Sequence, residues 1–402
     1  MELTTETVNE TVNEPVNEEI ACPLATWVAN VEQNGILQGT PEWKLARRFT
    51  IGGSNIATIM GENNYRTVKS FITDKVRGEG FAGNLETNWG NLFEPVIKDH
   101  AEHTFNCKII GENMFINGER SGLAYSPDGL AMVGRDCVLF EFKCPFSRMP
   151  NGKIPHHYIP QVKMGLAIIN LADKGLYMEG VFRRCSWAQL GWNRDYAPID
   201  TFRYGKTFTQ KIPESTGRST GSSVAKRTNL PADILAMGMI GFYCSGEHPL
   251  AADVVTEFGD TNQASVNNCK PIDLGGSSSM FFSKHMSACD NGSIKCRYYN
   301  AVYPNESYEA TLSAQMDTHV EFCKEMSLTC CGILSWKLFA HQTNWVEKDH
   351  TFLDKVQPKV DKIADALKKC YDPDYTDKVD MIIETLCAEL YDPPVDDDCE
   401  YA

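Results

Sequence analysis

The sequence predicts an α/β fold in which a mixed central β-sheet is flanked by helices. Residues 138–143 alternate apolar and polar side chains, the pattern of a strand whose two faces meet different surroundings. Residues 89–105 and 155–170 instead carry apolar side chains at helical spacing. Residues 175–182 form a further apolar run that we expect to complete the sheet. Strand patterns that alternate with helical ones are typical of α/β proteins.

The composition is that of a globular protein with a sizeable core. The 402 residues include 42% hydrophobic and 10% aromatic residues, enough for one large domain or two to three ordinary ones. No apolar run reaches the roughly 18 residues of a membrane span, and the N-terminus lacks a basic segment followed by an apolar one. We therefore expect a soluble intracellular protein without a membrane span or secretory signal.

The acidic charge is concentrated at the two ends of the chain. The formal net charge is −15. Residues 1–20 hold six Glu without a basic residue, and residues 371–402 hold eleven acidic residues and one Lys. The rest of the chain is close to neutral and can hold a local basic groove. We expect two acidic tails, and the repetitive first one is expected to be disordered.

Changes in composition predict the remaining boundaries. Residues 27–200 contain the strands and helices of the central sheet. Residues 203–230 are rich in Ser, Thr, Gly and basic residues, which predicts a flexible basic loop. Residues 231–370 carry apolar segments without a chemical motif, so they are either a C-terminal extension or a continuation of the same domain. Within them, residues 321–338 are expected to form a helix.

The fifteen cysteines are spread along the chain without a C-x-x-C pair. They are expected to be small buried side chains that stay reduced. An iron–sulfur cluster needs a tight group of cysteines beside the site. Cys323, Cys330 and Cys331 form such a group in the sequence, but their spacing does not match a cluster.

Residues 121–148 carry the clearest chemistry. Because side chains alternate along a strand, Glu141 and Lys143 share one face, and the two neighbouring phenylalanines share the other. Asp128 stands at the end of the preceding strand, where the following glycine favours a turn that redirects the chain. If the two strands pair, Asp128, Glu141 and Lys143 meet at one point.

Two carboxylates and a lysine suit the hydrolysis of a phosphodiester. Carboxylate oxygens bind Mg²⁺ or Mn²⁺, and such an ion acidifies a bound water and neutralises charge on the phosphoryl oxygens. Lys143 could orient or deprotonate that water, since burial and a nearby cation both favour its neutral form. The alternative is that residues 126–129 form an ordinary turn and that the Glu-x-Lys pair is a solvated stripe.

A second group of residues is suited to binding phosphate. Thr40 and Pro41 are expected to start a helix that carries Arg47. A tight glycine turn at residues 50–54, which includes Ser54, then leads into a second helix expected at residues 55–60. Glycine-rich turns and helix N-termini present free N–H groups to anions, and a serine hydroxyl adds a donor. Arg148 could add a bidentate contact to a phosphate.

The order of these blocks resembles a known family, the phage lambda exonuclease and its YqaJ-like viral recombinase relatives among the PD-(D/E)xK nucleases. Five blocks occur in the same order between residue 43 and about residue 170. They are Arg47 with Gly52-Gly53-Ser54, Trp89-Gly90 with Glu94-Pro95, Ser126-Pro127-Asp128-Gly129, Glu141-Phe142-Lys143-Cys144-Pro145-Phe146 with Arg148, and Tyr158 with Gln161. Residues 183–193 are also similar to the versions in large nucleocytoplasmic DNA viruses.

The resemblance implies a restriction-endonuclease-like core with a C-terminal extension and a catalytic site that uses Mg²⁺, with Mn²⁺ as the alternative and two ions in all. It assigns the metal to Asp128, Glu141, the backbone carbonyl of Phe142, and Glu94. It places Gln161 beside the attacking water or the scissile phosphate.

The resemblance also implies a pocket for the 5′-phosphate of a DNA end, built from Arg47, Ser54, Ser126 and Arg148. The implied activity is 5′-to-3′ digestion of linear double-stranded DNA during viral DNA recombination, repair or replication-end processing, in the host cytoplasm or nucleus. Expected partners are DNA with 5′-phosphorylated ends, a single-strand annealing protein and further copies of the chain. Two alternatives stay open: a structure-specific or general DNA endonuclease, and a non-catalytic protein that binds DNA ends.

Overall fold

A computed structural model describes most of the chain. The described residues are 23–37, 40–78, 85–112, 114–120, 122–146, 148–184, 200–203, 206–209, 235–247, 292–303 and 308–390. The predicted acidic segment at residues 1–20 and most of the predicted basic loop at residues 203–230 lie outside these ranges.

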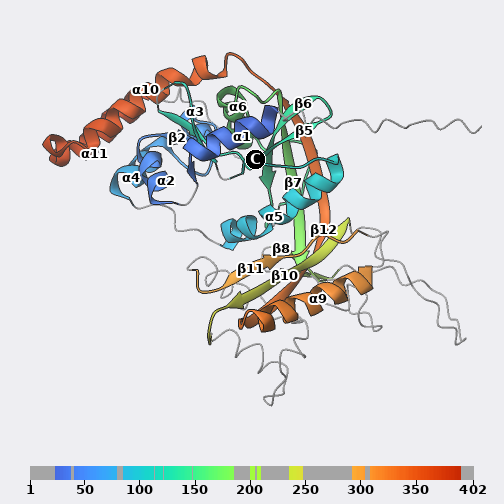
Figure 1. Ribbon diagram of the computed structural model, residues 1–402. Helices are drawn as coiled ribbons and strands as arrows, with labels where there is room; N and C mark the ends of the chain where they lie inside the picture. Colours follow the sequence, from blue (N-terminus) through green and yellow to red (C-terminus); the bar gives the residue numbers. More distant parts are fainter. Residues whose placement is uncertain are drawn as a thin grey trace, which may run out of the picture.

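A six-stranded mixed sheet runs through the molecule (Figure 1), in the order β11-β10-β12-β7-β6-β5. Its strands are β5 Gly129–Val133, β6 Asp136–Lys143, β7 Lys174–Arg184, β10 Ala236–Cys244, β11 Lys295–Tyr298 and β12 Thr329–Glu347. The pair β6–β7 is parallel, and the other four pairs are antiparallel. The predicted mixed central sheet is therefore confirmed.

A smaller sheet lies beside the large one, in the order β1-β3-β4-β2. Its strands are β1 Ile36–Leu37, β3 Met114–Asn117, β4 Leu123–Tyr125 and β2 Ile51–Gly52. The chain leaves β4 and enters β5 through residues 126–128. Asp128 thus lies at the junction of the two sheets. The strand that pairs with β6 is the one after this turn, not the one before it as the sequence suggested.

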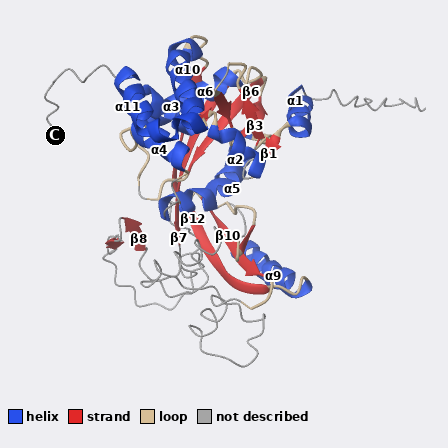
Figure 2. Cartoon of the chain, turned by 90° about the vertical axis from the view of Figure 1, so that its left-hand side faces the viewer, coloured by secondary structure: helices blue, strands red, loops and turns tan. Residues whose placement is uncertain are grey.

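The helices are α1 Pro23–Asn34, α2 Pro41–Arg48, α3 Gly53–Met60, α4 Val68–Arg77, α5 Leu85–Phe105, η1 His156–Tyr158, α6 Ile159–Ile168, α9 Tyr308–Glu325, α10 Phe352–Cys370, η3 Pro373–Lys378 and α11 Val379–Leu390. Most of them lie around the upper part of the large sheet, whereas α9 lies beside β10 at its lower end (Figures 1 and 2). The predicted start of α2 is confirmed, since the Thr40 hydroxyl accepts a 3.2 Å hydrogen bond from the Trp43 amide. Within the described part of the chain, no helix has the length and apolar character needed to cross a membrane.

The two faces of the sheet build two separate cores. Leu139 of β6 packs with α3, α4, α6, α10 and α11. Phe140 and Phe142 point to the opposite face and pack with the apolar side of α5. The predicted alternation along β6 is confirmed, and it leaves Glu141 on the face that α6 covers.

Two parts of the C-terminal half differ from the sequence-based expectation. Residues 321–338 are not one helix, because α9 ends at Glu325 and the long strand β12 begins at Thr329. Residues 334–338 alternate apolar and polar side chains, which is a strand signal that the expected helix overlooked. Residues 371–390 are not a tail either, since they form η3 and α11, and Ile383 and Leu386 lie in the core.

The packing of α11 can be tested with two substitutions on the same helix. Leu386→Ala should lower the free energy of unfolding by about 2–5 kcal/mol, because Leu386 is 4% exposed and its removal leaves a cavity. Met381→Ala should cost less than about 0.5 kcal/mol, because Met381 is 59% exposed. Denaturant unfolding measures both, and equal effects would show that α11 does not pack on the core.

Candidate active site

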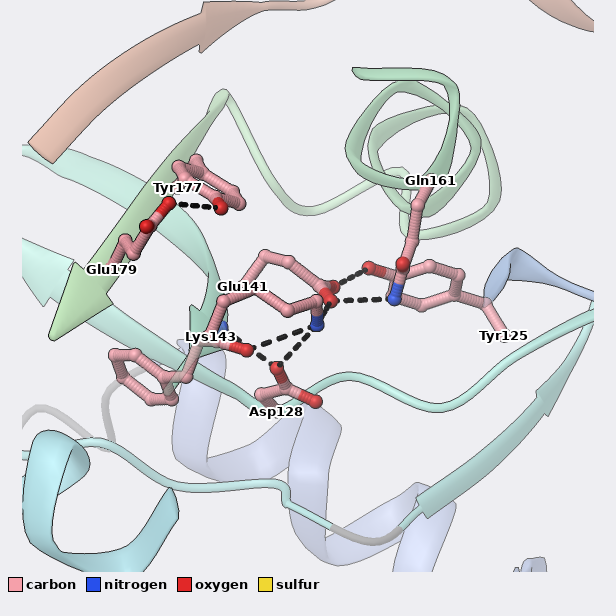
Figure 3. Close-up of polar contacts among 8 residues, drawn as sticks. Tyr125, Asp128, Glu141, Lys143, Gln161, Tyr177 and Glu179 are labelled. Atoms are coloured by element: carbon pink, nitrogen blue, oxygen red, sulfur yellow. Dashed lines mark hydrogen bonds and ion pairs between the residues drawn. The ribbon is translucent and has the colours of Figure 1, made fainter. Parts of the chain in front are cut away.

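The carboxylate of Glu141 is the hub of the polar cluster on β6 (Figure 3). Its side chain is 0% exposed. The Tyr125 hydroxyl donates to Oε2 at 2.8 Å, and the Gln161 amide donates to Oε1 at 2.5 Å. The Lys143 ammonium also donates to Oε1. Strand β4, helix α6 and strand β6 therefore converge on one carboxylate.

Asp128 joins this cluster from the junction between the sheets. Gly129 pairs with Phe140, which brings Asp128 beside the end of β6. The Phe142 amide donates to Asp128 Oδ2 at 2.8 Å, and Lys143 Nζ lies 4.0 Å from the same oxygen. The structure thus brings together the three residues that the sequence singled out.

Lys143 is charged in this arrangement. Burial by itself lowers the pKa of Lys143, but the carboxylates of Glu141 and Asp128 outweigh it, and the net effect is a raised pKa. The ammonium also donates to the Phe142 carbonyl at 2.9 Å. The neutral form expected from the sequence therefore requires a competing cation on the carboxylates, because in its absence they hold the proton on Lys143.

Glu94 lines a pocket of about 290 Å³ together with Asp128 and Phe142. Partial desolvation and the charges of Glu141 and Glu112 raise the pKa of Glu94, against the opposing effect of Lys143. Burial and Glu141 raise the pKa of Asp128 well above its usual range. The pocket therefore crowds more negative charge than Lys143 neutralises, which is the electrostatic setting of a cation site.

Arg148 lies next to the cluster but is held by a residue that sequence reasoning missed. Its guanidinium contacts Glu179 Oε2 at 3.0 Å, and Glu179 is fully buried in β7 opposite Lys143. The Tyr177 hydroxyl donates to the same oxygen at 2.8 Å, and the Gln342 side-chain amide donates to it at 3.3 Å. A carboxylate inside the apolar run at residues 175–182 was the available signal. The Arg148 side chain remains 39% exposed and can still face a ligand.

Arg47 and Ser54 lie at the end of α2 and the start of α3. The Arg47 guanidinium stacks 4.4 Å from the centroid of the Trp43 ring, which fixes its direction. Ser54 is exposed in the first turn of α3, and its hydroxyl accepts a 3.4 Å hydrogen bond from the side-chain amide of Asn55.

Two further cations surround Arg47, and sequence reasoning missed both of them. Arg66 donates to Asn55 at 3.2 Å and pairs with Asp74 at 2.6 Å. Lys75 donates to the backbone carbonyls of Arg47 and Thr50. Burial together with Arg47 and Arg66 lowers the pKa of Lys75 to about 8. Positive charges that repel one another in this way are stabilised when an anion binds between them.

A close contact connects this basic cluster to the carboxylates. A Cβ atom on Gly53 would lie 2.5 Å from the Tyr125 ring and 3.5 Å from Gln161 Cγ, so only glycine lets α3 start this close to them. Ser126 follows Tyr125 directly and leads to Asp128. The candidate phosphate residues and the carboxylate cluster are therefore neighbours in the fold.

Comparison with known proteins places these elements in a family. Residues 42–172 match the profile of the YqaJ-like viral recombinase domain. They include α2, α3, α5, β5, β6 and α6, which carry the candidate residues. This part of the chain, about a third of its length, is therefore similar to that domain. The resemblance predicted from the sequence is confirmed.

Similar proteins occur in a large DNA virus. A protein of African swine fever virus, isolate Tick/Malawi/Lil 20-1/1983, is 30% identical over 239 residues, which cover 51% of this chain and 66% of that protein. The corresponding protein from isolate Tick/South Africa/Pretoriuskop Pr4/1996 is 32% identical over 187 residues, which cover 39% of this chain and 54% of that protein. The chain thus matches between 54% and 66% of the length of these relatives.

Among solved structures, the alkaline exonuclease LHK-Exo from Laribacter hongkongensis matches with a TM-score of 0.29 and 21% identity, over 35% of this chain and 74% of that one. The same protein in complex with dAMP matches equally.

The donor set of the carboxylate cluster fits a hard divalent cation. Asp128, Glu94 and Phe142 line the same pocket. Carboxylate and carbonyl oxygens are the ligands that Mg²⁺ and Mn²⁺ prefer. The raised pKa values of Asp128 and Glu94 give an independent reason, because a bound cation would relieve the repulsion between these groups.

The repulsion predicts that the candidate site destabilises the metal-free protein. The folded pKa of Asp128 is raised, so folding loses stability above the unfolded pKa of the carboxyl and regains it at lower pH. Asp128→Asn should therefore raise the melting temperature by a few degrees at neutral pH in chelator, and by little near pH 3. Calorimetry at the two pH values measures the difference.

Asp349→Asn is the control of opposite sign. Hydrogen bonds from Thr351 and Lys355 lower the pKa of Asp349, so its charge stabilises the fold at neutral pH and the substitution should lower the melting temperature there. A lower melting temperature in Asp128→Asn as well would contradict the repulsion.

Proposed function

We propose that this protein is a deoxyribonuclease that depends on a divalent metal and digests linear duplex DNA from its 5′ end. The observation that carries the proposal is the meeting of Asp128, Glu141 and Lys143 at the end of β6, beside the pocket that Glu94 lines. Phosphodiester hydrolysis needs a cation site and a group that handles the attacking water, and this cluster offers both.

Asp128, Glu141, Glu94 and the Phe142 carbonyl would hold Mg²⁺ or Mn²⁺, as two ions. When bound, the metal supplies Lewis-acid stabilisation of the phosphoryl oxygens and an acidified water. The hydrogen bond from Tyr125 fixes the Glu141 carboxylate in one orientation and leaves Oε1 toward Lys143 and Gln161.

Lys143 and Gln161 act on the water and the scissile phosphate. Both donate to the same oxygen of Glu141, so their polar ends lie within reach of one site. With the carboxylate charge shared by a bound cation, burial would lower the pKa of Lys143. Lys143 would then accept a proton from water, while the Gln161 side-chain amide would orient the oxygen.

The basic cluster on α2 and α3 would recognise the DNA end. Arg47, held over Trp43, can make a bidentate contact to a terminal phosphate. Ser54 and the first amides of α3 add donors. Ser126 and Arg148, with Arg148 anchored by Glu179, would contact the same phosphate or the next one.

An exonuclease of this direction leaves a 3′-ended single strand, which suits recombination, repair or end processing of viral DNA in the host cytoplasm or nucleus. A single-strand annealing protein that takes up this strand and a ring of several copies of the chain are part of the same proposal. Support for the recombination setting comes from the YqaJ-like viral recombinase match.

The decisive measurement is cleavage of matched linear and closed circular duplex DNA in Mg²⁺ and in chelator. The linear form alone should disappear, and only with Mg²⁺.

Lys143→Ala should keep DNA binding but lose about 10²-fold or more of the cleavage rate, because it removes a proton-transfer group. Lys368→Ala, an exposed lysine of α10, should cut like wild type.

Other results of the cleavage experiment would support a different function. Cutting of the circle would establish the endonuclease alternative. Binding of ends without cutting of either form would establish a non-catalytic end-binding protein. Wild-type cleavage by Lys143→Ala would remove Lys143 from the reaction.

The end preference tests the basic cluster. Arg47→Ala should reduce the preference for 5′-phosphate over 5′-hydroxyl ends by about tenfold, because it removes a charged donor. Arg48→Ala is the matched control, since Arg48 follows Arg47 on α2 but lies over the Tyr371 ring. The ratio of cleavage rates on the two substrates gives the answer, and an unchanged ratio in Arg47→Ala excludes it from the pocket.

A further inference from the structure

A second cluster of potential ligands lies away from the carboxylates, between α9 and the beginning of β12. His319 and Cys323 are four residues apart on α9 and so share one helix face. Cys330 faces them from β12. The ligand atoms of the three side chains all lie within 4.8 Å of one another. His319 and Cys323 are buried, whereas Cys330 is partly exposed.

The imidazole of His319 is held in an orientation suited to a ligand. The Tyr299 hydroxyl lies 3.0 Å from Nδ1, so Nε2 is the nitrogen that faces Cys323, at 3.8 Å from Sγ. Metal-binding histidines commonly have their second nitrogen fixed by such a partner. Gly241 of β10 lies directly beneath the ring, where a side chain would collide with it. The sheet therefore leaves space for this histidine and fixes its position.

The charges of the three side chains also suit a divalent ion. Two thiolates and one neutral imidazole would give a divalent ion a site without net charge, and such a site tolerates burial.

The ligand types and distances distinguish zinc from harder ions. Zn²⁺ binds thiolates at about 2.3 Å and imidazole at about 2.0–2.1 Å, which puts sulfur and nitrogen of a tetrahedral site about 3.6 Å apart. The 3.8 Å between Cys323 Sγ and His319 Nε2 is close to this value. Sulfur and imidazole ligands disfavour Mg²⁺ and Ca²⁺.

We propose that His319, Cys323 and Cys330 bind one Zn²⁺ ion that clasps α9 to the sheet. Water takes the fourth position, which it reaches past the partly exposed Cys330. Cysteine spacing alone does not reveal this site, because Cys331 points away and contacts Cys244 at 3.4 Å, and the third ligand is a histidine from the helix before.

The clasp would also support the pocket of the carboxylate site. Tyr299, which holds His319, lines that pocket together with Tyr298 and Asn300. The zinc proposal does not rest on the proposed nuclease function, since its ligands are separate from Asp128 and Glu141.

The test is titration of the reduced full chain with Co²⁺, followed by competition with Zn²⁺. Cobalt bound to cysteine gives a thiolate charge-transfer absorption that carboxylate sites do not give, so binding at Asp128 or Glu141 does not interfere. Wild type should show this absorption at one Co²⁺ per chain and lose it when Zn²⁺ is added. Mass spectrometry of metals should find about one Zn²⁺ per chain in the isolated protein.

The variants separate the cluster from other cysteines. Cys323→Ser and Cys330→Ser should each weaken Co²⁺ binding by at least about tenfold, and Tyr299→Phe should keep the absorption but weaken affinity about tenfold. Cys387→Ser, a partly exposed cysteine of α11, should bind like wild type. Circular dichroism shows that each variant is folded.

Three results would overturn the proposal. The first is no thiolate absorption in reduced wild type with excess Co²⁺, a measurement that no variant can spoil by unfolding. The second is an unchanged absorption in both Cys323→Ser and Cys330→Ser. The third is a disulfide between Cys323 and Cys330 in protein isolated under reducing conditions.

Discussion

The buried carboxylate of Glu141 is the group on which the site and its surroundings depend. An enclosed negative charge costs several kcal/mol unless donors and a counter-charge surround it. Tyr125, Gln161 and Lys143 supply them. The phenol and amide donors come from β4 and α6, so the small sheet and the helix are held against β6. The contacts that stabilise this buried carboxylate therefore also fix the geometry of the site.

The strands after residue 235 belong to the same scaffold. Strand β12 pairs with β10 through its first half, residues 329–338, and with β7 through its second half, residues 336–347. Its Gln342 donates to Glu179, and Glu179 holds Arg148. Two segments far apart in the chain thus cooperate to position one guanidinium. Removal of β12 would expose the edge of β7 and release Arg148, so the site needs the C-terminal half although none of its carboxylates comes from there.

Local patterns predicted the parts of the fold that local physics determines. Alternation along β6 correctly placed Glu141 and Lys143 on one face, whereas Asp128 joins them because β5, the strand that follows it, pairs with β6. The start of α2 followed from its cap. The helix expected at residues 321–338 was wrong because it was extended past the end of α9 into residues 334–338, which alternate apolar and polar side chains as a strand does. Glu179 carried one local signal, a carboxylate inside an apolar run. Its role was missed because its partners Arg148 and Gln342 meet it only through the fold of distant segments.

The two proposed ion sites differ in chemistry and meet at one strand. Oxygen ligands select Mg²⁺ or Mn²⁺ at the carboxylates, and sulfur with imidazole selects Zn²⁺ at α9. Strand β11 is the edge of the described sheet, and the segment after it is held by the Ala301 amide on Asp99 and by Tyr299 on His319. Both Asp99 and Tyr299 line the pocket. An ion that fixes His319 would therefore stiffen one wall of the pocket without contacting the substrate. The zinc ion would then have a structural role, and the ion at the carboxylates would take part in the reaction.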